Sequence, residues 1–249
     1  MEGRRVHPLE RTLASSTGVS ARSLLIALVY TVAASAAAAS AAMVSAASIT
    51  STQGPQQILD RAVSDFRAGR LAESAAGFDR FAELRPDYAP QLWQRGIALY
   101  YVGRYQDCRE QFESHRTVNP NDVENAVWHF LCVARAETPE IARAALLPVG
   151  PDRRAPMKEI YALFRGDLAP EEVMAAAGDQ SSPLFYAHLY VGLYFEALGR
   201  EEAAFEHIAA AANDRYAAAG GYMHMVARVS CNVHSKRRPA FDGGPSSSC

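Results

Sequence analysis

Histidine and cysteine side chains are the first candidates for chemistry in this sequence, because both are common zinc ligands. A zinc site needs about four ligands, usually supplied as residue pairs at short spacing. Cys231 and His234 form one such pair, but no second pair accompanies them. The histidines beyond the N-terminal segment are His115, His129, His188, His207, His224 and His234. We therefore expect no metal site.

The chain also lacks the short motifs that position catalytic groups. It contains no GxSxG, no Walker A sequence, no HExxH and no GxGxxG. The acidic pairs Glu171-Glu172 and Glu201-Glu202 lie near expected helix starts, where negative charge complements the helix dipole. We expect no catalytic residues and no cofactor, and a protein that is not an enzyme.

Two further cysteines, Cys108 and Cys132, lie in successive expected helices. Two interpretations stay open: a pair of buried thiols or, if the chain is exported, a disulfide, for which the Cα spacing must be suitable. Cys249 is the last residue and fits no prenylation pattern.

Residues 1–46 have the composition of a targeting or anchoring segment. Arginines precede an apolar run at 24–30, which fades into alanine and serine before small residues at cleavage-type spacing. We expect a cleaved leader that directs the chain to an exported or periplasmic location or to an organelle lumen. The alternatives are an uncleaved helix through residues 23–42 that tethers the chain to a membrane, and a simple disordered leader.

The composition of the chain is that of an ordinary globular protein. Of its 249 residues, 49% are hydrophobic and 21% are charged, so it can bury a sizeable core. The formal net charge of −2 at pH 7 argues against binding nucleic acid through a phosphate-neutralising face. We expect no nucleic-acid partner.

A repeat of 34 residues organises the part of the chain that follows the leader. Three pairs of like residues lie 34 positions apart: Gly69 and Gly103, Phe78 and Phe112, and Pro86 and Pro120. Such a period is typical of a helix–turn–helix array, in which glycine serves the turn and proline ends the second helix.

The period and these residue types resemble the tetratricopeptide repeat (TPR) family. Counted from Ala89, Gly96 and Cys108 are the small residues where two helices approach, and Phe112 fills the space between neighbouring hairpins. The resemblance covers about residues 55–233. In its arrangement of repeats the chain is similar to bacterial envelope TPR lipoproteins and to related exported or organellar TPR proteins. No cysteine follows the apolar run, so a lipid anchor there is not expected. The resemblance implies an adaptor or scaffold.

We expect an all-α, TPR-type helix–turn–helix solenoid over residues 47–235, with an irregular middle hairpin. Its parts are repeats at about 55–88 and 89–122, a degenerate repeat at 123–184, a repeat at 185–218, and a terminal helix to 235. Residues 236–249 are expected to form a disordered tail.

Within the degenerate repeat the sequence predicts four short helices. They are Val123–Ala136, a helix from Pro139 to Leu147, and a hairpin of Met157–Phe164 with Pro170–Ala177. The terminal helix is predicted from Tyr216, with a weak point or an interruption at Gly220-Gly221.

The resemblance also implies where a partner binds, because the first helices of TPR repeats line a concave face. The candidate groove residues are Phe66, Arg67, Trp93, Ile97, Tyr100, Tyr101 and Arg135. Glu124 occupies a corresponding position in the degenerate repeat. The hypothesis is that Trp93, Tyr100 and Tyr101 grip an apolar or extended segment of a partner protein. The alternative is that these rings pack against the irregular middle or the terminal helix.

From the sequence we expect a protein–protein interaction scaffold or adaptor of TPR type in an exported or organelle-lumenal compartment. Two alternatives stay open. One is a structural subunit of a membrane-associated complex, and the other is an enzyme or metal-dependent protein that uses the irregular middle and the C-terminal half.

Overall fold

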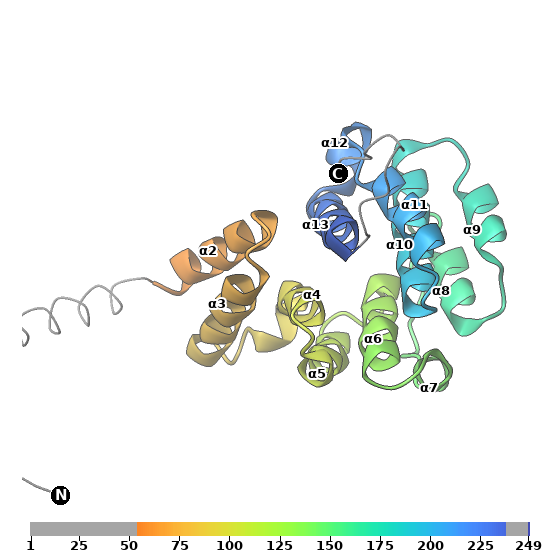
Figure 1. The fold of residues 1–249 in the computed structure, drawn as a ribbon. Helices are drawn as coiled ribbons and strands as arrows, with labels where there is room; N and C mark the ends of the chain where they lie inside the picture. The colour runs from red at the N-terminus through yellow and green to blue at the C-terminus, as the bar shows by residue number, and fades with distance from the viewer. Residues whose placement is uncertain (1–53, 238–248) are drawn as a thin grey trace, which may run out of the picture. The chain divides into compact units, whose positions relative to one another are not determined.

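The computed structural model describes residues 54–237 and Cys249, which form an array of helices (Figure 1). No strand occurs in this part of the chain, so the all-α prediction is confirmed. The first half contains α2 (Pro55–Arg67), α3 (Leu71–Leu84), η1 (Ala89–Gln91), α4 (Trp93–Tyr101), α5 (Tyr105–Arg116) and α6 (Val123–Ala136). The second half contains α7 (Pro139–Ala144), α8 (Met157–Arg165), α9 (Pro170–Ala177), α10 (Ser181–Ala197), α11 (Glu201–Ala211), η2 (Asp214–Tyr216), α12 (Ala217–Gly220) and α13 (Tyr222–Arg237).

The two regular repeats are helical hairpins with glycine at each turn. Gly69 joins α2 to α3 with a φ of 72°, and Gly103 joins α4 to α5 with a φ of 79°. This left-handed conformation favours glycine, which has no Cβ to clash with the backbone. The 34-residue spacing of these two glycines therefore reflects a repeated turn.

Gly96 lets α4 approach α5 closely. A Cβ atom at this position would lie 2.6 Å from the Phe112 ring, which is fully buried. The same arrangement recurs between α10 and α11, where a Cβ at Gly192 would lie 2.7 Å from Ile208. The prediction that Gly96 lies where two helices approach closely is confirmed, and the large residue it meets is Phe112 of the same hairpin.

The irregular middle follows the predicted order of helices. α6 and α9 have the predicted bounds, and α8 extends one residue further, to Arg165. α7 ends at Ala144 rather than Leu147, since the chain there turns towards the loop that carries Pro151 and Asp152. α10 begins at Ser181, four residues before the predicted repeat, because Pro183 is tolerated in the first turn of a helix.

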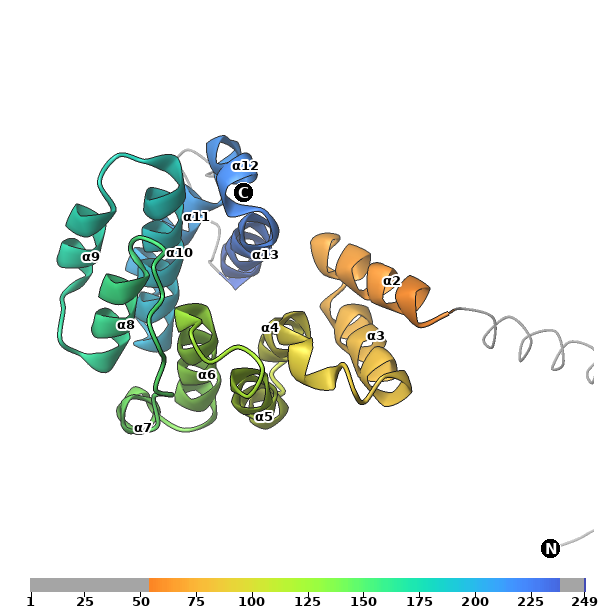
Figure 2. The ribbon, with the colours of Figure 1, turned by 180° about the vertical axis from the view of Figure 1, so that it is seen from behind.

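The last helix folds back along the inner side of the array. The predicted interruption is present at Gly221, which has a φ of 53° and separates α12 from α13. α13 contacts α11 beside it and also α2, the helix at the other end of the array (Figure 2). It continues to Arg237, two residues beyond the predicted end, and Cys249 forms a disulfide with Cys231. Residues 238–248 of the predicted tail lie outside the described residues.

The leader at 1–46, with the membrane tether considered at 23–42, also lies outside the described residues. Among the helices of the described range, none combines the length and the apolar character needed to cross a lipid bilayer.

Candidate binding groove

The aromatic residues predicted to line a groove lie against α13. Phe66, Ile97 and Tyr100 are buried. The Tyr222 ring of α13 lies 6.1 Å from the Phe66 ring and 4.8 Å from the Trp93 ring, measured between centroids. This packing matches the alternative in which the rings face the terminal helix.

A buried polar contact fastens the same helix to α4 and α10. The Tyr100 hydroxyl donates a hydrogen bond of 2.9 Å to Glu196 Oε1, and the imidazole of His234 on α13 lies 3.2 Å from Glu196 Oε2. Burial acts to raise the pKa of Glu196, but the contacts with His234 and Tyr100 and the charge of Arg135 together outweigh it, so the pKa is lowered. His234, which the sequence paired with Cys231 as weak zinc ligands, therefore holds α13 in place.

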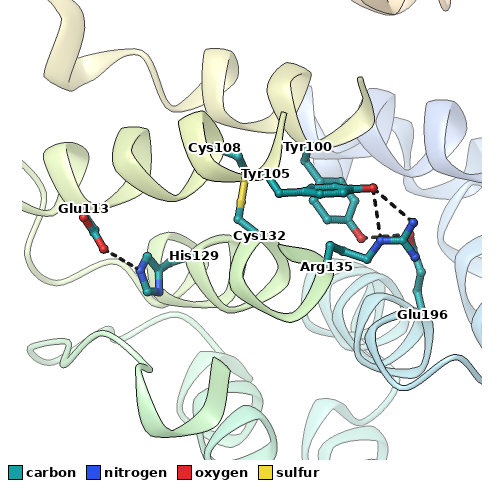
Figure 3. Close-up of a disulfide and its surroundings, with 8 residues drawn as sticks. All are labelled: Tyr100, Tyr105, Cys108, Glu113, His129, Cys132, Arg135 and Glu196. Atoms are coloured by element: carbon teal, nitrogen blue, oxygen red, sulfur yellow. Dashed lines mark hydrogen bonds and ion pairs between the residues drawn. A yellow bond between two sulfur atoms is a disulfide. The ribbon is translucent and has the colours of Figure 1, made fainter. Parts of the chain in front are cut away.

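The other predicted groove residues have partners within the chain. Arg67 donates to the Met225 sulfur at 3.4 Å and lines a cavity of about 420 Å³ between α2 and α13. Tyr101 packs against Phe66 and Tyr100. Arg135 donates to the Tyr105 hydroxyl, as Figure 3 shows. Of the seven predicted residues, Trp93 is the one that lines the two cavities described next.

Trp93 stands between two adjoining cavities, which we call together the groove. The deep cavity has a volume of about 160 Å³ and is lined by Trp93, Phe112, His115, Asp122, Glu124, Asn125, Trp128 and Met223. The outer cavity has a volume of about 500 Å³ and is lined by Tyr88, Gln91, Trp93, His115, Val118 and Asn119. Trp93 and His115 line both cavities, so the two cavities adjoin at these residues.

The outer cavity has an apolar rim. Tyr88 is 37% exposed and Val118 is 49% exposed, and they lie on the loops before α4 and after α5. Large apolar side chains at this exposure are common one at a time on protein surfaces. Two of them at the mouth of one groove form a surface that an apolar side chain of a partner could cover.

One wall of the deep cavity comes from α5. Phe112 and His115 lie three residues apart and therefore on the same helix face. His115 Nδ1 donates to the Pro90 carbonyl at 2.8 Å, because a carbonyl can only accept. In the neutral ring this leaves Nε2 as an acceptor.

The opposite wall is the first turn and a half of α6. Asp122 caps this helix by accepting a hydrogen bond from the Glu124 backbone amide at 3.0 Å. The cap fixes the start of the helix, and Trp128 then falls on the same side as Glu124 and Asn125, since it lies four and three residues after them.

Two contacts hold the α5 and α6 walls together. A disulfide joins Cys108 to Cys132, with Cα atoms 5.8 Å apart, and His129 Nε2 donates to Glu113 Oε1 at 3.3 Å (Figure 3). Of the two interpretations of Cys108 and Cys132, the disulfide is therefore the one present in the structure.

The charge at the α6 end of the groove is acidic. Arg154 donates to Asp122 at 2.7 Å and to Asp152 at 2.6 Å, and its guanidinium lies 3.6 Å from Glu124 Oε1. Three carboxylates thus share one guanidinium. Burial raises the pKa of the Glu124 carboxyl to about 7, and the Asp122 carboxylate acts in the same direction.

Several polar atoms beside the deep cavity have no hydrogen-bond partner in the described part of the chain. Asn125 Oδ1 and Trp128 Nε1 belong to residues that are 3% and 1% exposed. Glu124 Oε1 also makes no hydrogen bond within this part of the chain, and its ionic neighbour is the Arg154 guanidinium at 3.6 Å. Burying such groups without a partner costs free energy, so a molecule that satisfies them is expected to bind favourably.

The remaining histidines form no metal centre in the residues that the structure describes. His188 and His207 face one another, with their Nδ1 atoms 3.2 Å apart, and His224 contacts the Asn213 carbonyl. No group of three or more His, Cys, Asp or Glu side chains within 54–237 could hold a metal ion.

Sequence reasoning placed Trp93 and Glu124 on the inner face but missed the rest of the groove. Trp128 belongs to the apolar set of its helix, and nothing in the spacing indicates that its indole N–H lacks a partner. Asp122 caps its helix, but its role in an acidic cluster depends on Arg154 from a distant loop. No known protein-family model matches this chain.

Proposed function

We propose that this protein is a TPR-type binding module that receives a short, extended segment of a partner protein in the groove. The observation that carries the proposal is the pair of adjoining cavities, the outer one with an exposed apolar rim and the deep one beside the buried polar atoms of Asn125 and Trp128. An extended peptide could place an apolar side chain on the rim and a polar group in the deep cavity. In this role the protein is an adaptor or scaffold.

The cysteines support the proposed location in an exported or lumenal compartment. All four cysteines of the sequence are paired, as Cys108–Cys132 and Cys231–Cys249. Structural disulfides persist in oxidising compartments and are rare in the reducing cytosol. The pairing therefore favours an extracytosolic or organelle-lumenal site of action.

Selection from a random heptapeptide display library on the immobilised full chain tests the proposal. We expect enriched peptides to bind the wild type and to lose binding when Val118→Asp places a charge on the apolar rim. Ile141→Asp is the matched control, because Ile141 on α7 is 45% exposed but lines neither cavity of the groove. Both variants should unfold at the wild-type temperature, because both positions are exposed.

Two results would contradict this function. One is the absence of any enriched peptide. The other is a set of peptides that bind Val118→Asp and the wild type equally well, since those peptides would be using another surface.

A further inference from the structure

The deep cavity offers hydrogen-bond acceptors to whatever enters it. Asn125 Oδ1 and Glu124 Oε1 have no hydrogen-bond partner in the described part of the chain, and His115 presents Nε2 as an acceptor when its ring is neutral. A ligand with several N–H donors would satisfy this set. A carboxylate only accepts, so it could pair with the unpartnered Trp128 indole N–H but not with these acceptors.

The walls of the cavity suit a positive charge. Trp93, Phe112 and Trp128 present aromatic rings to the cavity, and a cation over an aromatic face is attracted by the negative potential of the ring. Asp122 and Glu124 also line the cavity, and the three carboxylates at this end outnumber the single guanidinium of Arg154. Charge, aromatic walls and free acceptors point to the same class of ligand.

We infer that the deep cavity binds an alkylammonium group, such as the side chain of a lysine or the amino terminus of a partner segment. A volume of about 160 Å³ accepts a short alkyl chain that ends in an ammonium. The three N–H bonds of the ammonium would reach Asn125, Glu124 and His115, while the alkyl part contacts the rings. This inference rests on the proposed function, because the ammonium is carried by the bound segment.

Both tryptophans of the chain, Trp93 and Trp128, line this cavity, so their indole N–H signals report on it directly. We would titrate the ¹⁵N-labelled full chain with n-butylammonium, and with n-butanol and butyrate as the neutral and anionic analogues. A pH of about 7.5 lies above the raised pKa of Glu124 and below the usual pKa of an α-amino group.

Butylammonium is expected to shift both indole signals in a saturable way, while butanol and butyrate shift them at least about tenfold less at equal concentration. Glu124→Gln, which keeps the shape and removes the charge, should weaken butylammonium binding by about tenfold. Glu110→Gln is the control, because Glu110 is an exposed acid on α5 that does not line the groove. An unfolding temperature no lower than that of the wild type shows that lost binding is not lost folding.

Two tripeptides then distinguish the sources of the ammonium. Acetyl-Ala-Lys-Ala-amide presents it on a side chain, and Ala-Ala-Ala-amide presents it at the amino terminus. Binding of the first assigns the cavity to lysine, and binding of the second assigns it to an N-terminus. If butylammonium binds and neither tripeptide does, the cavity takes a free amine.

Equal shifts by butanol, butyrate and butylammonium, or no saturable shift by any of them, would overturn the inference. Failure here is distinct from failure of the proposed function. If display-selected peptides require Val118 but carry no ammonium, the proposed peptide-binding function stands and only the inferred ammonium site is wrong.

Discussion

Glu124 carries an unfavourable charge in the unliganded protein. Its carboxylate is largely removed from water and stands beside Asp122, and the pKa of about 7 expresses the resulting preference for the neutral form. Arg154 opposes the shift but is shared with Asp122 and Asp152. A residue that is costly for stability and positioned in a cavity is typical of a functional site.

Replacing this carboxyl should therefore stabilise the protein at neutral and alkaline pH. The folded-state pKa is raised above its usual value, so the folded state holds the proton more tightly and the wild type loses stability as the pH rises from about 4.5 to about 7. Glu124→Gln cannot ionise, so its advantage should grow across this window and then level off at about 1–3 kcal/mol.

Urea unfolding of the wild type and of Glu124→Gln at a series of pH values measures this difference. Glu110→Gln should follow the wild type at every pH. A Glu124→Gln variant that is less stable than the wild type at pH 8 would show that the Glu124 charge is favourable as it stands.

In the hairpin of α4 and α5, Gly96 packs against Phe112, and Phe112 lines the deep cavity. A methyl group at residue 96 would come within 2.6 Å of a buried ring that also lines the deep cavity. Gly96→Ala should therefore cost about 1–3 kcal/mol of unfolding free energy by overpacking. Gly54→Ala is the control, since nothing lies within 4 Å of a Cβ there.

Thermal or denaturant unfolding of the two glycine variants gives the comparison. If Gly96→Ala has the unfolding free energy of the wild type, α4 and α5 can accommodate the added methyl group, and the described packing of α4 on α5 would be wrong.

α13 depends on a single buried ionic contact as well as on its apolar face. His234 lies between Glu196, which is 4% exposed, and Glu201, whose side chain is 54% exposed. His234→Ala should cost about 3 kcal/mol, because it leaves the buried Glu196 carboxylate without its contact on α13. Glu201→Gln should cost less than about 1 kcal/mol, because an exposed partner contributes little.

Hydrogen exchange of the α13 amides, measured on both variants, locates the effect. Faster exchange confined to α13 in His234→Ala is the expected result. Equal protection of α13 in the two variants would mean that the contact with Glu196 does not hold the helix.

Much of this fold could be predicted from the sequence, because a 34-residue period constrains helix lengths and turns directly. The pairs Gly69–Gly103 and Phe78–Phe112 predicted two hairpins, and Thr138 with Pro139 predicted the start of α7. The return of α13 to α2 left no such signal. It depends on contacts such as Tyr222 with Trp93, between residues far apart in the chain.

The groove was less predictable than the helices. A motif search ranks residues by type and spacing, whereas the groove depends on which polar atoms lack partners after folding. Trp128 and Asn125 have ordinary places in an amphipathic helix, and Arg154 comes from a loop without a motif. Cys249 likewise follows a polar segment, and no spacing in the sequence indicates its pairing with Cys231.

Two disulfides, Cys108–Cys132 and Cys231–Cys249, link residues of the molecule, and they lead to a prediction about its redox state. Protein purified from its native host should show no reactive thiol in denaturant, and four after reduction. Replacing Cys108 and Cys132 together by Ala should cost about 2–4 kcal/mol, since this disulfide closes a loop of 24 residues. It should also weaken peptide binding, because it joins the α5 and α6 walls of the groove.

Titration of thiols with a chromogenic reagent and denaturant unfolding of the double variant test both statements. Reactive thiols in the protein from the native host, before any reduction, would contradict both the oxidised state of the cysteines and the proposed compartment.

The central claim is that a partner segment lies in the groove, and a spin-labelled peptide tests it most directly. A display-selected peptide carrying a nitroxide would be added to the ¹⁵N-labelled full chain, and relaxation of the indole N–H signals of Trp93 and Trp128 would be measured against the backbone amide of Ile141. The account predicts strong broadening of both indole signals and none of Ile141. Unbroadened indoles, with broadening instead around Arg67 and Met225 in the cavity between α2 and α13, would contradict it.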